Sequence, residues 1–150
     1  MTRTVAVVLL FGTASLVGRA DVADAAKKLD GTYAVVSAVV AGQPDAERFA
    51  KAELTFKGGA VTMSEKGRII QESTIKVDPA KTPAWIDVAD KRGGRSGDVR
   101  KGVYQTRTTP DGFELTLAVR LDDAKMKDRP KDFKGDEDTI VLKLIRKEAK

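Results

Sequence analysis

From Leu29 to the C-terminus, apolar and polar residues alternate in short runs that are separated by Gly, Pro and Asp. A half-buried strand needs one apolar face and one wet face, so a period of two predicts antiparallel strands. The clearest run covers residues 113–120, where apolar side chains occupy every second position. The pattern predicts an all-β fold of about eight strands, in which an antiparallel sheet closes into a barrel or folds into a sandwich.

Turn signals separate the runs. The pairs Gly58-Gly59 and Lys66-Gly67 suit tight turns, because glycine adopts positive φ at little cost. One short helix is predicted after the first strand, over residues 45–50, where Pro44 and acidic residues favour a helix start. This helix is placed to close one mouth of a barrel. The other expected strands are residues 32–40, 53–57, 61–63, 68–78, 85–90, 102–109 and 139–147.

Strict alternation also assigns side chains to faces of the sheet. In the last strand we expect an inward row of Ile140, Leu142 and Leu144. In the first strand we expect one face to carry Tyr33, Val35, Ser37 and Val39.

The first 25 residues have a different pattern. Arg3 precedes an apolar stretch, residues 5–17, and the small residues Ala23 and Ala25 follow it in an A-x-A arrangement. This order is typical of a secretory signal peptide. The apolar stretch is also shorter than the roughly 20 residues that span a bilayer, so we expect no stable membrane insertion.

We therefore expect a signal peptide over residues 1–25 and one folded domain over residues 26–150. Cleavage after Ala25 is expected, and cleavage after Ala20 is the alternative. The protein is then exported, to the periplasm or to the extracellular space.

The chain contains no cysteine and no histidine. Disulfides, thiol nucleophiles, histidine-based triads and ordinary structural zinc sites are therefore excluded. No two carboxylates stand out as an acid–base pair. We expect neither catalysis nor a cofactor.

The net charge of +5 lies in residues 91–150. A glycine-containing loop there suits either an anionic group or a solvated turn, and we favour the turn. No aromatic residues alternate with the basic residues of this loop, so we expect no nucleic-acid binding. The acidic residues of 122–138 suit either calcium or a solvated loop, and we favour the loop because the spacing of a calcium-binding loop is absent. The basic residues of the first loop are Lys91, Arg92, Arg95, Arg100 and Lys101.

The segment Leu29-Asp30-Gly31-Thr32-Tyr33 resembles the opening of an uncharacterised family of small, exported bacterial lipocalin-like domains, whose first strand begins with Gly-x-Trp. The resemblance covers nearly all of residues 26–150. It implies a lipocalin-like, antiparallel up-and-down barrel, in which the ring of Tyr33 closes the base beneath Arg146 through a cation–π contact. Further matches in the family's order are Leu54-Thr55-Phe56-Lys57-Gly58, Val77-Asp78-Pro79, Gly102-Val103-Tyr104, Arg129-Pro130 and residues 140–146.

A lipocalin-like barrel implies a cup that could hold an apolar or amphiphilic guest. Tyr104 would supply a polar contact inside it, and Arg129 would pair with an anionic head group at the rim. The alternative is a filled core, because eight strands enclose a space that side chains alone can fill. The expected ligand contacts are Phe56, Met63, Ile86, Tyr104, Leu117 and Arg129.

The segment Arg129-Pro130 with Phe133 allows a second, structural interpretation, which we favour. Phe133 would pack beneath its loop, and Arg129 would pin the loop by donating to backbone carbonyls.

The expected function is that of a monomeric, non-enzymatic protein that binds a small hydrophobic or amphiphilic ligand. The alternative is a structural or protein-interaction module of the cell envelope with a filled core.

Overall fold

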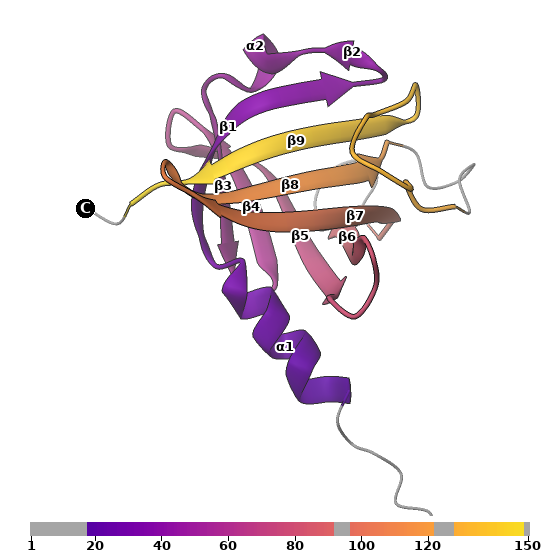
Figure 1. Cartoon of the computed structure of the whole chain (residues 1–150). Coiled ribbons are helices and arrows are strands. Elements are labelled where there is room, and N and C mark those ends of the chain that lie inside the picture. The colour runs from indigo at the N-terminus through magenta and orange to yellow at the C-terminus, as the bar shows by residue number, and fades with distance from the viewer. Residues whose placement is uncertain (1–17, 92–96, 122–127, 149–150) are drawn as a thin grey trace, which may run out of the picture.

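The computed structural model describes residues 18–91, 97–121 and 128–148. In this part of the chain, eight antiparallel strands form a closed barrel in which strands adjacent in sequence pair and the last pairs with the first (Figure 1). The prediction of an up-and-down barrel is confirmed. The elements are α1 (Gly18–Lys28), β1 (Gly31–Val40), β2 (Gln43–Pro44), α2 (Ala46–Phe49), β3 (Ala52–Lys57), β4 (Ala60–Glu65), β5 (Arg68–Asp78), β6 (Ala84–Asp90), β7 (Val99–Thr109), β8 (Gly112–Arg120) and β9 (Thr139–Arg146).

Tight turns keep neighbouring strands antiparallel. Between β3 and β4, Gly58 and Gly59 have φ values of 57° and 82°, and Lys57 pairs with Ala60 directly across the turn. Two successive positive φ values match the right-handed twist of the flanking strands, and glycine adopts them without strain. The predicted short helix is α2, which follows β1 after the two-residue strand β2.

Strand β1 departs from strict alternation at a β-bulge. Its register against β9 shifts between Val35 and Ser37, and Val36 is half exposed. The extra residue exchanges the inner and outer faces for the rest of the strand. The expectation that Tyr33, Val35, Ser37 and Val39 share one face is therefore wrong. The β1 side chains in the interior cluster are Tyr33, Val35, Ala38 and Val40.

Two apolar clusters lie on opposite sides of the sheet. The larger one is inside the barrel and includes the expected inward row of β9, Ile140, Leu142 and Leu144. The smaller one is outside, where Val141 and its neighbours pack against Phe133. Strand β8 consequently buries both of its faces, with Leu115–Val119 all buried.

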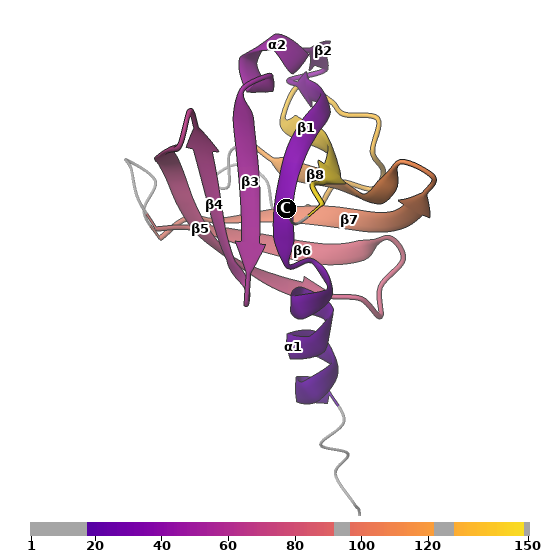
Figure 2. The ribbon, with the colours of Figure 1, turned by 90° about the vertical axis from the view of Figure 1, so that its left-hand side faces the viewer.

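Helix α1 lies at the end of the barrel where β1 begins and packs against β5 (Figures 1 and 2). Ala25 and the following Leu29 are buried in the interior cluster. The expected signal peptide lies outside the described residues up to residue 17 and overlaps α1 from Gly18 onward, so its cleavage site stays a prediction. No helix within the described ranges has the length and apolar character needed to cross a membrane.

Gly102 of β7 has close neighbours in the barrel wall. A Cβ atom there would be 2.6 Å from the carbonyl oxygen of Ala118 and 2.9 Å from Cγ2 of Val119. The first of these atoms belongs to the backbone of a neighbouring strand, which cannot move without disturbing the sheet. Glycine is thus required at this position by close packing.

We expect Gly102→Ala to lower the free energy of unfolding by about 1–3 kcal/mol, because the added methyl group overpacks the wall. Urea denaturation measures this change. The control is Thr106→Ala, on the exposed part of the same strand, which should cost less than about 1 kcal/mol. Equal losses in the two variants would show that the close packing at Gly102 has no energetic consequence.

Candidate functional site: a cavity in one half of the barrel

The end of the barrel that carries α2 contains a cavity of about 470 Å³. This volume is within the range of small-molecule pockets. All eight barrel strands and α2 contribute to its wall, which is mainly apolar. Four of the six predicted ligand contacts line it: Phe56, Met63, Ile86 and Leu117.

Tyr104 does not line the cavity, which corrects its expected position. It faces inward from β7, but it pairs with Ala84 and Leu117 nearer the closed end, where side chains fill the interior. Burial, and secondarily the negative charge of Asp78, raise the pKa of the Tyr104 hydroxyl. The barrel thus has one filled half and one hollow half. The filled core and the ligand-holding cup, which are alternatives in the sequence analysis, each describe one of these halves.

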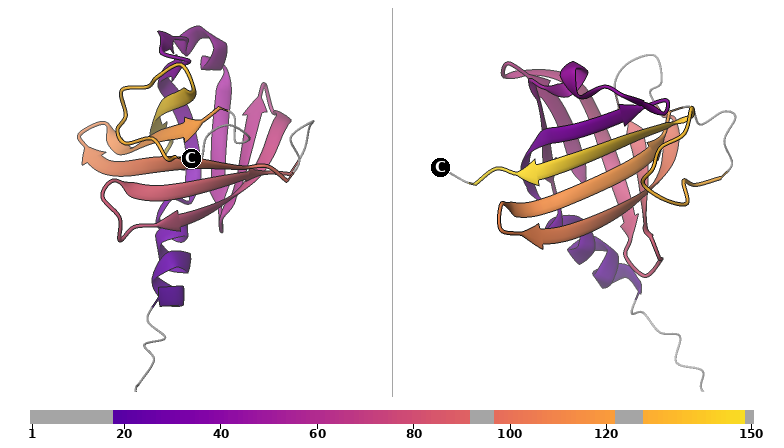
Figure 3. Two further views of the ribbon diagram at one scale, coloured as in Figure 1. Left: turned by 90° about the vertical axis from the view of Figure 1, so that its right-hand side faces the viewer. Right: turned by 45° about the horizontal axis from the view of Figure 1, so that its top comes forward.

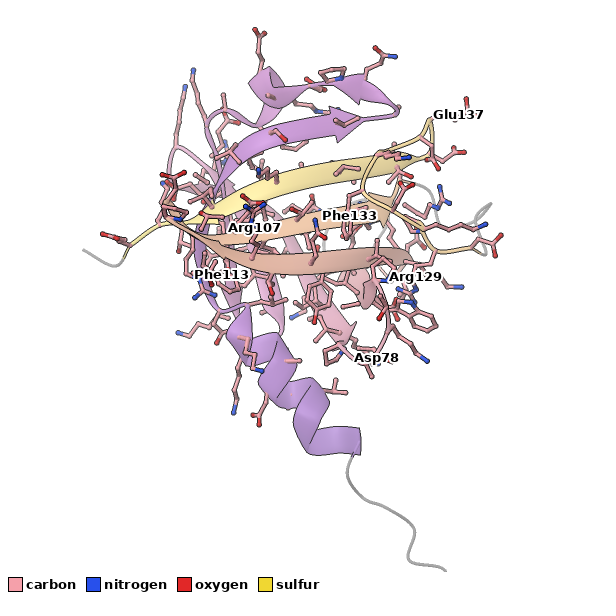
Figure 4. All side chains as sticks on the ribbon, viewed as in Figure 1. Asp78, Arg107, Phe113, Arg129, Phe133 and Glu137 are labelled. Carbon is pink, nitrogen blue, oxygen red and sulfur yellow. The ribbon has the colours of Figure 1, made fainter. Side chains whose placement is uncertain are left out.

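Arg129 also lies away from the cavity, on the outer face of the barrel (Figure 4). Its Nη1 donates to the carbonyl oxygens of Ile86 (2.9 Å) and Gly102 (2.7 Å). The same atom is 2.7 Å from Oδ1 of Asp87, an ion pair without hydrogen-bond alignment. The guanidinium also stacks on Trp85, 4.4 Å from the ring centroid. The expectation of a rim contact with a ligand is therefore not met.

The physical reason is the path of the segment 128–138, which runs over the outside of the sheet (Figure 3, right). Phe133 packs against Val103, Ala118 and Val141 there. The structural interpretation of Arg129 and Phe133 is the one that the contacts support.

Asp136 fixes the end of this outer segment. Its carboxylate accepts from Arg120 Nη1, at 3.1 and 2.9 Å, and from the Thr139 hydroxyl. The pKa of Asp136 is lowered, chiefly by the Thr139 hydroxyl and then by Arg120, because both stabilise the charged form.

The wall of the cavity includes a polar group that the sequence analysis missed. Oδ1 of Asp90 accepts from Gln71 Nε2 (3.0 Å), Ser73 Oγ (2.8 Å) and Arg100 Nη2 (3.0 Å). We call Gln71, Ser73, Asp90 and Arg100 the polar wall. Ser73 and Asp90 are 5% and 7% exposed and face each other across β5 and β6. Gln71, Ser73 and Arg100 line the cavity directly.

A sequence signal for the polar wall existed. Ser73 begins the inward row that continues with Ile75 and Val77, and Asp90 ends the row that begins with Ile86. A polar residue in an apolar row indicates a buried partner. The glycine-containing loop predicted for this region included Arg100, which instead lies in β7 beside the cavity.

The rim of the cavity is partly covered by α2. Phe49 of this helix is buried and lines the cavity, as expected of a helix placed at the mouth. Arg48 lies over the Phe49 ring, 5.9 Å from its centroid, and 3.8 Å from Asp45. Glu65 and the half-exposed Ile70 complete the rim from β4 and β5.

The opposite end of the barrel is closed by Tyr33 and Arg146. The cation–π contact implied by the resemblance is present, with the guanidinium carbon of Arg146 5.4 Å from the Tyr33 ring centroid. The same carbon is 4.1 Å from the centroid of Phe113, and Phe56 meets the Tyr33 ring edge-on at 5.3 Å.

Hydrogen bonds join this closure to α1. Arg146 Nη2 donates to the Tyr33 hydroxyl (2.8 Å) and to the carbonyl oxygen of Lys28 (2.6 Å), the last residue of α1. The Tyr33 hydroxyl donates in turn to the carbonyl oxygen of Leu29, at 2.8 Å. A cation at a helix C-terminus is favourable, so the closure also holds the helix in place. Burial raises the pKa of the Tyr33 hydroxyl, although Arg146 opposes this effect.

The two charged loops considered in the sequence are described only in part. Arg92 and Arg95 of the basic loop and Asp122 and Asp123 of the acidic segment lie outside the described residues. Within the ranges that are described, no three acidic side chains are grouped so as to hold a metal ion.

Comparison of the chain with protein-family models, with curated proteins and with solved structures finds no match. The resemblance to exported lipocalin-like domains is therefore not tested by these comparisons.

We predict that neither tyrosine of the folded protein ionises at its ordinary pKa of about 10. Because both pKa values are raised, the stability contributed by the neutral phenols is complete below about pH 10 and is lost as the pH rises through the folded-state values. Phenolate absorbance should therefore appear only at higher pH, together with unfolding followed by circular dichroism. Tyr104→Phe assigns the remaining signal to Tyr33. Phenolate formation near pH 10 in an intact barrel would contradict the prediction.

We predict that Asp136→Asn reduces the dependence of stability on acidic pH. The pKa of Asp136 is lowered in the folded state, so its contribution is present above the unfolded value of about 3.9 and is lost as the pH falls through the folded value. Urea denaturation across this range measures the effect. Thr139→Val, which removes the hydroxyl but keeps the carboxylate, should reduce the dependence in part. Identical pH profiles for Asp136→Asn and the wild type would refute the assignment.

Proposed function

We propose that the protein binds a small apolar or amphiphilic molecule in its cavity and that it performs no catalysis. The observation that carries this proposal is the hollow half of the barrel, about 470 Å³ with a mainly apolar wall and a few polar groups on one side. A space of this size and lining suits a guest with an apolar body and a limited number of polar atoms.

The contrast between the two halves supports a role for the hollow one. At the closed end, Tyr33, Leu115 and Leu144 are fully buried and fill the interior. In the other half, the cavity-lining side chains of Met63 on β4 and Ile140 on β9 are only partly buried. Unfilled volume lowers stability, so a hollow half is most readily explained by a guest.

The proposal includes the export of the protein as a monomer, without nucleic acid or cofactor. Its support is the order of Arg3, the apolar residues 5–17 and the A-x-A arrangement ending at Ala25. The lack of cysteine and histidine in the sequence supports a binding role rather than nucleophilic or zinc-dependent catalysis.

The alternative is an interaction module of the cell envelope. The half-exposed Ile69 and Ile70 beside the cavity favour it, because exposed apolar side chains can contact a partner. A wholly filled core, which this alternative assumed, is not what the structure contains.

We predict that the protein binds N-phenylnaphthylamine, an uncharged fluorophore that brightens in apolar surroundings, and that Val61→Phe weakens this binding by at least about tenfold. Val61 lines the cavity, so the larger ring occupies the space of the probe. The measurement is a fluorescence titration of the purified full-length chain.

The matched control is Val99→Phe, the same substitution at an exposed position of β7, which should bind the probe like the wild type. Circular dichroism verifies that both variants are folded. Absence of binding to the wild type, or equal binding by the two variants, would refute binding in the cavity.

A further inference from the structure

The polar wall contains a buried ion pair that borders the cavity. The side chain of Arg100 is 15% exposed and that of Asp90 is 7% exposed, and the two are joined at 3.0 Å. They come from neighbouring strands, β6 and β7, near the end that carries the cavity. Burying two charges is unfavourable, and hydrogen bonds that satisfy both groups offset this cost.

The hydrogen bonds of the pair are unevenly distributed. Oδ1 of Asp90 receives three donors, from Gln71, Ser73 and Arg100. Nε of Arg100 is buried, and no acceptor is within hydrogen-bonding geometry of it among the described residues. A buried donor without a partner is unfavourable, and such groups are rare in folded proteins. The side chain of Arg100 lines the cavity, but its Nε is covered by neighbouring protein atoms, so a guest reaches this unused donor only when the side chain turns toward the cavity. The charge of the pair is already balanced.

From this arrangement we propose, building on the proposed binding function, that the ligand carries a neutral hydrogen-bond acceptor, such as a ketone or ester carbonyl, which accepts the Nε–H of Arg100. The apolar part of the ligand then lies against the apolar lining, including Phe56, Met63 and Leu142. The polar wall thus selects for the chemical class of the head group.

A carboxylate head group suits this site less well. It would place a second anion beside Asp90, and one guanidinium cannot balance both charges in a partly desolvated site. The rim does not change this balance. Arg48 lies 3.8 Å from Asp45 with 66% of its side chain exposed, and the acidic Glu65 also lines the cavity.

The test compares three ten-carbon compounds that differ only in their head group: decane, 2-decanone and decanoate. Each competes with N-phenylnaphthylamine for the full-length chain. A hydrogen bond from a charged donor should make 2-decanone bind about tenfold more tightly than decane. Decanoate should bind more weakly than 2-decanone. This comparison uses the wild type and so does not depend on the folding of any variant.

A second arm tests the donor itself. Arg100→Lys keeps a cation for Asp90 but puts a methylene group where Nε stood, so the advantage of 2-decanone over decane should fall to about twofold or less. The control, Arg107→Lys, makes the same change at an exposed position of the same strand (Figure 4) and should keep the full advantage. In the wild-type complex, the carbonyl stretch of isotope-labelled 2-decanone should shift to lower frequency than in hexane.

The outcomes separate this inference from the proposed function. If neither the probe nor any of the three compounds binds, both are overturned. If decane and 2-decanone bind equally, if decanoate binds most tightly, or if Arg100→Lys keeps the full advantage, the cavity still binds ligands and only the neutral-acceptor inference fails.

Discussion

Closure of the sheet between β1 and β9 is the constraint on which the rest of the structure depends. The two strands pair from Tyr33 opposite Arg146 to Val40 opposite Ile140, so the first and last strands leave no open edge between them. At one end of this seam, Arg146 joins the Tyr33 ring, Phe113 and the end of α1. One cation thereby fixes the base of the barrel, and a cation–π contact of this kind contributes roughly 0.5–2 kcal/mol.

Much of this fold could be predicted from the sequence, because the alternation of apolar residues directly reflects burial. The β-bulge at Val36 could not be predicted, since nothing in a run of β-branched and small residues marks the extra position. As a consequence, Val39 faces outward. A Cβ atom added to Gly135 would lie 3.1 Å from Cγ1 of Val39, so the two residues are in close contact. The outer segment of the chain therefore packs closely against β1 at Gly135.

The candidate site was predicted in part for the same reason. Alternation places Phe56, Met63 and Leu117 on an inward face, and the barrel implied by the resemblance makes that face the wall of a cavity, which they do line. Alternation gives the face of a side chain but not its depth along the barrel axis, and this explains why Tyr104 proved to lie in the filled half. Contacts such as that between Arg100 and Asp90 depend on the register of neighbouring strands, which the sequence does not specify.

The buried pair of Asp90 and Arg100 is best understood through its position. Replacement of a buried ion pair by apolar residues of similar volume is often neutral or stabilising, so such a pair is weak evidence of a contribution to stability. In the filled half, the interior cluster is built from apolar side chains and tyrosine, and the pair stands apart from it beside the cavity. A stabilising role would be served equally well by valine or leucine at these positions. Valine or leucine could not orient a guest, because orientation requires a directional hydrogen-bond donor. Arg100 has such a donor in its Nε–H, which no described residue accepts.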